Sequence, residues 1–128
     1  MTILLDSVIL IDLLNDVEAS ALYLARVRAE AVVSVVTRTE VLTGANPKEL
    51  SAALDILDLF PTLEITKNVA DLAARLRRQH RWKLPDAYQA ALAEAHHLKL
   101  ATRNTEDFSP DRHDFVTIPY TITASPAS

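Results

Sequence analysis

The sequence predicts a three-layer α/β/α domain with a mainly parallel sheet of four or five strands. Short apolar runs alternate with longer amphipathic segments, and this alternation implies strand–helix–strand units joined by right-handed crossovers. A chain of 128 residues, of which 49% are hydrophobic, can bury one continuous core. We therefore expect a single domain over residues 1–120, followed by a flexible C-terminal tail over residues 121–128 that carries Ala, Ser and Pro.

The first strand, two helices and the second strand are expected in turn. The apolar run at residues 2–5 is typical of a strand buried on both faces, and apolar residues resume at helical spacing over residues 9–14. Residues 17–30 are rich in Ala, Leu, Arg and Glu, which favour a helix. The β-branched run at residues 31–36 favours a second buried strand.

The next helix is expected to begin with a capping box. Thr37 is the predicted N-cap, Glu40 follows three positions later, and Gly44, the only glycine, marks the end of the helix. This arrangement places Glu40 in the first turn. A further helix is predicted over residues 47–60 from its apolar spacing, and Pro61 ends it.

The second half of the chain continues the alternation. A short strand is expected at residues 63–66, and residues 69–80 form an amphipathic helical pattern whose other face is basic. A helix is expected over residues 85–97, because Pro85 suits a first helical turn. The last two strands are expected at residues 99–102 and 116–118.

The composition excludes several classes of protein. Without cysteine, disulfides and thiolate zinc sites are impossible. No apolar run reaches the roughly 18 residues of a membrane-spanning helix. The N-terminal residues Met1-Thr2-Ile3 lack the basic region of a secretory signal, so we expect a cytoplasmic protein with no membrane association. The net charge of −4 argues against non-specific polyanion binding, although a carboxylate cluster neutralised by metal would account for four negative charges.

Carboxylates recur at the edges of apolar segments. Residues at the carboxyl ends of parallel strands, and in the loops beyond, converge on one crevice where ligands bind. Mg²⁺ and Mn²⁺ prefer carboxylate oxygens, whereas each carboxylate taken alone could cap a helix or solvate a loop. Asp6 is the strongest candidate, because an unpaired carboxylate directly after a buried strand is costly to desolvate. The candidate ligands of one or two ions are Asp6, Glu40, Asp86 and Asp107.

Four short motifs carry these carboxylates. They are residues 4–12 (LLDSVILID), 34–42 (SVVTRTEVL), 84–87 (LPDA) and 101–108 (ATRNTEDF). In content and order they resemble the motifs of PIN domains, specifically the toxin ribonucleases of VapBC toxin–antitoxin systems. Each motif alone has low specificity, whereas all four in the family's order, across a chain of the usual family length, make a strong resemblance.

The resemblance implies a function and a set of site residues. The chain would be the toxin of a toxin–antitoxin pair, an endoribonuclease that hydrolyses RNA phosphodiester bonds with water activated by Mg²⁺ or Mn²⁺. Asp6, Glu40 and Asp86 match the shared acidic residues, and the fourth position stays open between Asn104 and Asp107. An Asn would coordinate through its carbonyl oxygen without adding charge. The resemblance also implies a homodimer and a cognate VapB-type antitoxin that obstructs the site.

A basic segment leads toward Asp86. Candidate contacts with the RNA backbone are Arg78, Arg81, Lys83 and, in the last motif, Arg103. Trp82 could stack on a base. The alternatives are a solvated helix face, with Trp82 closing the edge of the core and Arg103 pairing with a carboxylate.

Two other functions compete with an active ribonuclease. A catalytically inactive PIN-like protein-binding module fits the departures from the family pattern at Val8 and Asn104. A phosphoacceptor signalling domain also places an Asp at a strand end beside Mg²⁺, but Lys99 begins its strand where such a domain needs a lysine at a strand end. For Asp12 we expect a solvated or capping role, and we expect the four histidines to lie at the surface.

Overall fold

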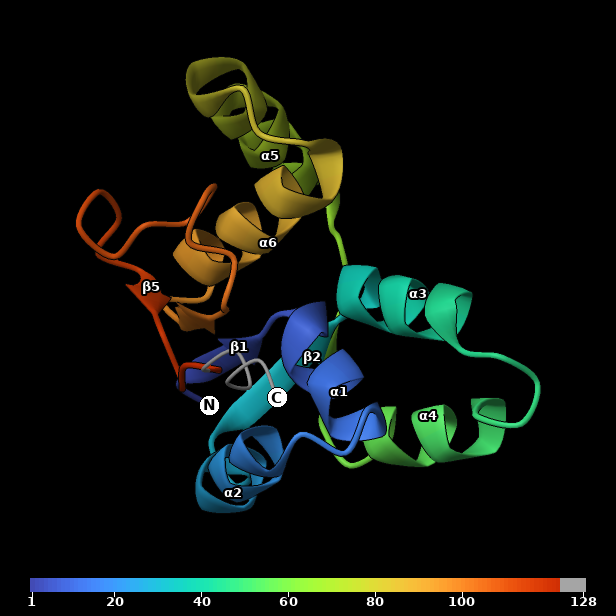
Figure 1. Cartoon of the computed structure of the whole chain (residues 1–128). Helices are drawn as coiled ribbons and strands as arrows, with labels where there is room; N and C mark the ends of the chain where they lie inside the picture. Colours follow the sequence, from blue (N-terminus) through green and yellow to red (C-terminus); the bar gives the residue numbers. More distant parts are fainter. Residues whose placement is uncertain (123–128) are drawn as a thin grey trace.

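A five-stranded sheet forms the centre of the structure, a computed structural model that describes residues 1–122 (Figure 1). The strand order is β3-β2-β1-β4-β5, and every neighbouring pair runs parallel. The predicted α/β class with a mainly parallel sheet is therefore confirmed. The strands are β1 (Ile3–Leu5), β2 (Ala31–Ser34), β3 (Thr62–Leu63), β4 (Lys99–Ala101) and β5 (Val116–Thr117).

Helices cover both faces of the sheet, with α5 and α6 on one side and α1 to α4 on the other (Figure 1). Successive side chains of a strand point to opposite faces, which divides the core into two halves. Leu4 thus packs with residues of α5 and α6, whereas Leu5 packs with residues of α1 to α4. The helices are α1 (Ser7–Leu14), α2 (Glu18–Val27), α3 (Val35–Gly44), α4 (Leu50–Leu57), α5 (Lys67–His80) and α6 (Leu84–Ala95).

The helix α3 begins earlier than the capping box predicts. Ser34 ends β2 and is the N-cap of α3, because its hydroxyl accepts a hydrogen bond from the Thr37 N–H at 3.0 Å. Thr37 therefore lies inside the helix, and its own hydroxyl donates to the Leu5 carbonyl at 3.0 Å. The prediction of Thr37 as N-cap is wrong, and Glu40 lies in the second turn of α3 rather than the first.

Strand pairing also moves the predicted ends of elements. The register pairs Val33 with Thr62 and Ser34 with Leu63, so β3 starts earlier and is shorter than the predicted residues 63–66. Since α3 begins at Val35, β2 ends before the predicted residue 36.

The described part of the chain holds no helix long and apolar enough to cross a membrane. Of the predicted tail, residues 123–128 lie outside the described residues.

Three helices are followed by a left-handed residue that is not glycine. Asp16 after α1 has φ 59°, Arg81 after α5 has φ 58° and His97 after α6 has φ 55°. After Asp16 and His97 the next N–H donates to a carbonyl of the last turn, from Val17 to Asp12 at 3.0 Å and from Leu98 to Ala93 at 2.8 Å. This is the Schellman arrangement, in which glycine is the usual left-handed residue because it has no Cβ.

We expect His97→Gly to raise the free energy of unfolding by about 1 kcal/mol. A side chain in the left-handed region costs roughly 1–2 kcal/mol, which exceeds the extra unfolded-state entropy of glycine. Urea unfolding would measure the change. The matched control is His96→Gly, because His96 is equally exposed but has φ −104°, and this change should lower stability. A loss of stability in both variants would contradict the prediction.

Candidate active site

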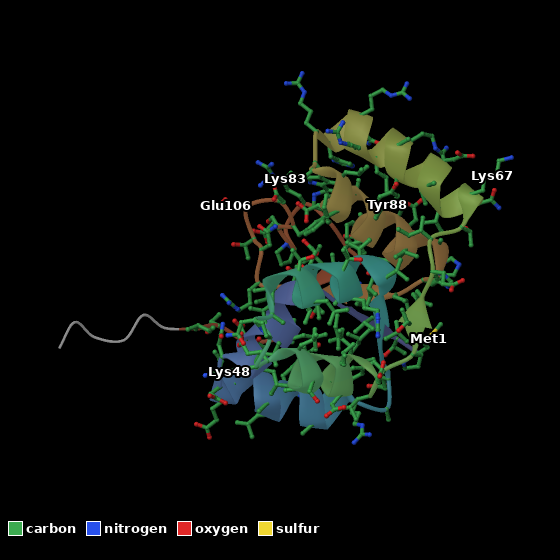
Figure 2. The ribbon with its side chains drawn as sticks, turned by 90° about the vertical axis from the view of Figure 1, so that its right-hand side faces the viewer. Met1, Lys48, Lys67, Lys83, Tyr88 and Glu106 are labelled. Atoms are coloured by element: carbon green, nitrogen blue, oxygen red, sulfur yellow. The ribbon has the colours of Figure 1, made fainter. Side chains whose placement is uncertain are left out.

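The carboxyl edge of the sheet has its switch point between β1 and β4. The chain leaves β1 through helices on one face and enters β4 from helices on the other face. Open α/β sheets bind ligands at such a point, beyond the carboxyl ends of the strands. Asp6 directly follows β1 and Thr102 directly follows β4. Figure 2 shows Lys83 and Glu106 on the left of the molecule and Met1, which precedes β1, on the right.

Asp6 is a buried carboxylate held by three hydrogen-bond donors. Asp6 is only 7% exposed. Oδ1 accepts from the Ser7 N–H at 2.9 Å and from Gln89 Nε2 at 3.3 Å, and Oδ2 accepts from Thr102 Oγ1 at 2.7 Å. These bonds replace hydration that burial removes, and they fix the direction of the carboxylate.

A buried polar network connects Asp6 to the neighbouring elements. Ser34 Oγ donates to Gln89 Oε1 at 2.7 Å, and Gln89 Nε2 donates to Thr37 Oγ1 at 2.7 Å. The sequence patterns do not single out Gln89, Ser34 or Thr102. For Gln89 a signal exists, because its amide lies between Ala87 and Ala90 in an otherwise apolar helical run.

The charges of the predicted carboxylates affect one another's pKa values. Burial raises the pKa of Glu40, and the charge of Asp6 raises it further, while a hydrogen bond from the Ser7 hydroxyl opposes the shift. Burial also raises the pKa of Asp86, to about 7, with further contributions from the charges of Asp6 and Asp107, a hydrogen bond with Asp107 and the charge of Glu40. All four acidic candidates therefore belong to one region of negative potential.

This donor set fits a hard divalent cation in its chemistry. Within residues 1–122, no three Asp, Glu or His side chains stand close enough to form a closed metal-binding group. The carboxylates nevertheless shift one another's pKa values, because charges interact over longer distances than the roughly 2.0–2.6 Å of a metal–oxygen bond. Oxygen ligands with surplus negative charge are what Mg²⁺ or Mn²⁺ requires.

In the last motif, Asp107 rather than Asn104 affects another acid of the site. The charge of Asp107 and a hydrogen bond with it contribute to the raised pKa of Asp86. Asn104 Nδ2 donates to Asp107 Oδ2 at 3.1 Å, and the Asn104 N–H donates to Thr102 Oγ1 at 3.0 Å. The geometry therefore gives Asn104 a supporting place behind Asp107.

The remaining acid of the first motif, Asp12, has a different environment. It is only 6% exposed, so the expectation of a solvated side chain is wrong. Arg103 binds it through Nε at 2.7 Å and Nη2 at 2.8 Å, and the Tyr120 hydroxyl donates to it at 2.7 Å. This cluster attaches the loop after β4 to α1. The guanidinium of Arg103, a predicted RNA contact, therefore binds Asp12 instead.

Trp82 closes the edge of the core. It is 6% exposed, its indole N–H donates to the Asp107 carbonyl at 3.1 Å, and His80 stacks on its ring with centroids 4.2 Å apart. Phe108 packs against the same ring at a centroid distance of 5.1 Å. Of the two alternatives for Trp82, base stacking is therefore wrong, since neighbouring rings already contact it.

A cleft of about 310 Å³ adjoins Asp107. His80 and His113 are half-buried in it, whereas His96 and His97 are exposed. Burial lowers the pKa of His113, and the charges of His80 and Arg112 lower it further. The residues that line the cleft are His80, Trp82, Glu106, Asp107, Arg112 and His113.

Comparisons with known proteins find similar sequences and folds. The family model described as the PIN domain matches residues 3–110. A toxin–antitoxin complex from Klebsiella pneumoniae contains a chain with 32% sequence identity and a TM-score of 0.82, and the match covers 94% of this chain and 100% of that chain. No curated protein sequence matches significantly.

Two further solved structures are similar. The structure of FitAcB from Neisseria gonorrhoeae matches with 26% identity and a TM-score of 0.75, over 94% of this chain and 100% of that chain. VapBC2 from Rickettsia felis, bound to a DNA fragment from its promoter, matches with 19% identity and a TM-score of 0.74, over 91% of this chain and 96% of that chain. At that identity the second likeness concerns the fold alone.

We expect the metal-free protein to lose stability as pH rises from about 5 to about 8. The pKa of Asp86 is about 7 in the folded state against an ordinary value of 3.8, so the folded state binds more protons than the unfolded state between these values. Stability therefore falls as pH rises through this window. Thermal unfolding in EDTA should show a smaller decrease for Asp86→Asn, which cannot ionise.

The control for this measurement is Asp111→Asn, a change of the same chemistry at an exposed loop residue. It should leave the pH dependence of the melting temperature as in the wild type. Equal pH dependence in the wild type and Asp86→Asn would contradict the prediction.

Proposed function

The chain belongs to the PIN domain family, as its four motifs predict, and we propose that it is the toxin of a toxin–antitoxin pair and a metal-dependent endoribonuclease. The observation that supports this proposal is the electrostatic interaction of Asp86 with Asp6, Asp107 and Glu40 beside the switch point of the sheet. Such a cluster is electrostatically unfavourable in itself, since burial and like charges raise the pKa values of Glu40 and Asp86. Perturbed acids of this kind are characteristic of functional sites.

Asp6, Glu40, Asp86 and Asp107 are the proposed metal ligands. Bound Mg²⁺ or Mn²⁺ would supply activation of water and stabilisation of negative charge on the phosphate. Asp6 is already oriented by its three donors, and Asn104 Nδ2 donates a hydrogen bond to the carboxylate of Asp107. These residues would supply oxygen ligands from the residue after β1, from α3 and α6, and from the loop after β4.

Protons and cations compete for this site. Glu40 and Asp86 both have raised pKa values, so each holds a proton more tightly than an exposed carboxyl group. Carboxylates must be ionised to bind a cation. Cation affinity should accordingly increase with pH through the neutral range, and hydrolysis with it.

The RNA backbone is proposed to lie across the end of α5 and the start of α6. Arg78, Arg81 and Lys83 are exposed there, and the cleft beside Asp107 adds Arg112. Cations along this path can neutralise phosphates and offset the negative potential of the acids. Arg103 would contribute least to direct contact, because its guanidinium fork is bound to Asp12.

A VapB-type antitoxin and a second copy of the chain are the proposed protein partners. The similar chain from Klebsiella pneumoniae, which this chain covers completely, is part of a toxin–antitoxin complex. Several leucines on α2, α4 and α6 offer apolar surface that a partner can cover. They are Leu22, Leu50, Leu59, just beyond α4, and Leu84, which are 42–65% exposed.

The first test is cleavage of a mixed pool of tRNA and ribosomal RNA. We expect the wild type to cut with Mg²⁺ or Mn²⁺ and to stop in EDTA, and Asp6→Asn to reduce the rate by roughly 100-fold or more. Asp55→Asn, an exposed acid on α4, is the matched control and should cut like the wild type. A folded wild type, free of antitoxin, that cuts none of these RNAs in several metals would instead support the inactive PIN-like binding module.

The RNA path is tested by reversing charges. The double variant Arg78→Glu with Lys83→Glu should lower kcat/KM roughly tenfold through KM, with a weaker dependence on salt, because phosphate contacts are lost. The control pair is Lys48→Glu with Lys67→Glu, whose positions lie away from Lys83 in Figure 2 and whose net charge change is the same. Equal losses in both pairs would indicate a general charge effect and contradict this path.

A further inference from the structure

Gln89 is a buried amide beside the carboxylate of Asp6. It is 1% exposed, and the other buried residues of α6 are all apolar: Ala87, Ala90, Ala91, Leu92 and Ala93. An aliphatic side chain would fill the same space without the cost of removing an amide from water. The retained amide therefore requires an explanation from its hydrogen bonds.

Only one orientation of the Gln89 amide satisfies its hydrogen bonds. Thr37 Oγ1 gives its proton to the Leu5 carbonyl, so it can only accept from Gln89 Nε2. Ser34 Oγ accepts from the Thr37 N–H, which leaves its own proton for Gln89 Oε1. Rotating the amide by 180° would place Oε1 against the carboxylate of Asp6, where two acceptors repel. The orientation of Gln89 is thereby determined by its partners.

Helical spacing connects these contacts to the acids. Gln89 lies three residues after Asp86 on α6, and Thr37 lies three residues before Glu40 on α3. Residues three apart lie on the same side of a helix. The 2.7 Å bond between Gln89 and Thr37 therefore joins the two helix faces that carry Asp86 and Glu40.

The contact with Asp6 completes the arrangement. A carboxylate offers about four lone-pair positions, and Ser7, Gln89 and Thr102 occupy three of them. One position is left for a cation, in a direction that the three donors determine. The 3.3 Å bond from Gln89 is the longest of the three, so Gln89 is held mainly by Thr37 and Ser34 and orients Asp6 from that anchored position.

We propose that Gln89 is a positioning residue that holds α3, α6 and Asp6 at the separation needed for cation binding. The proposal rests on the proposed function in that these acids are the metal ligands. Gln89 itself touches neither cation nor RNA. Its effect is transmitted through Asp6 and through the relative placement of Glu40 and Asp86, as groups behind metal ligands commonly act.

The test compares two substitutions to methionine on the buried side of α6. Gln89→Met keeps a side chain of similar length but removes the amide, whereas Leu92→Met, at a residue 0% exposed, changes the same core outside the network. Mn²⁺ binding is measured by calorimetry and by the electron paramagnetic resonance of free Mn²⁺. We expect Gln89→Met to weaken Mn²⁺ binding roughly tenfold or more, and Leu92→Met to leave it unchanged. Equal Mn²⁺ affinity in both variants would overturn the proposal.

A second pair of variants covers the case in which Gln89→Met does not fold. Thr37→Val removes the acceptor of the Gln89 amide with little change of shape, and Thr37→Ser restores a hydroxyl. Weak Mn²⁺ binding in the Val variant with recovery in the Ser variant supports the positioning role. If both variants bind Mn²⁺ as the wild type does, the role is overturned.

Failure of the proposed function gives a different result, in which the wild type itself binds no Mn²⁺. Crystal structures in EDTA then decide the role of Gln89. A displacement of the Asp86 and Glu40 carboxylates in Gln89→Met, absent from Leu92→Met, supports positioning. Unchanged carboxylates would overturn it.

Discussion

Burial of the Asp6 carboxylate is the constraint around which the site is built. A carboxylate that is 7% exposed at the end of a central strand is stable only when donors replace its lost water. The donors come from α1, from α6 and from the residue after β4. The ends of β1 and β4 must therefore meet α1, on one face of the sheet, and α6, on the other face, at one point. The parallel sheet with its switch point between β1 and β4 provides that meeting point.

The acids of the site differ in how well their charge is compensated. Asp6 has three donors and Asp12 has Arg103 and Tyr120, whereas burial and like charges raise the pKa values of Glu40 and Asp86. The compensated acids connect elements of the fold. The uncompensated acids store repulsion that a divalent cation would relieve, which is the relation between stability and activity expected of a functional site.

The surroundings of the acids separate structural aromatic residues from exposed cations. Trp82 is covered by His80 and Phe108 and holds the Asp107 carbonyl, so it belongs to the scaffold of the site. Arg78, Arg81 and Lys83 stay exposed beside it. A buried aromatic edge with exposed cations around it suits recognition of a phosphate backbone, which needs charge more than fixed geometry.

The sequence by itself determined the α/β class and the order of the elements, because the periodicity of apolar residues is a local signal. It could not place Gln89, Ser34 or Thr102, whose partners lie 55 to 96 positions away along the chain. Only the tertiary structure assigned the N-cap to Ser34, buried Asp12 against Arg103 and covered Trp82. Hydrogen-bond partners and ring contacts depend on which segments the folded chain brings together, and no local pattern encodes that choice.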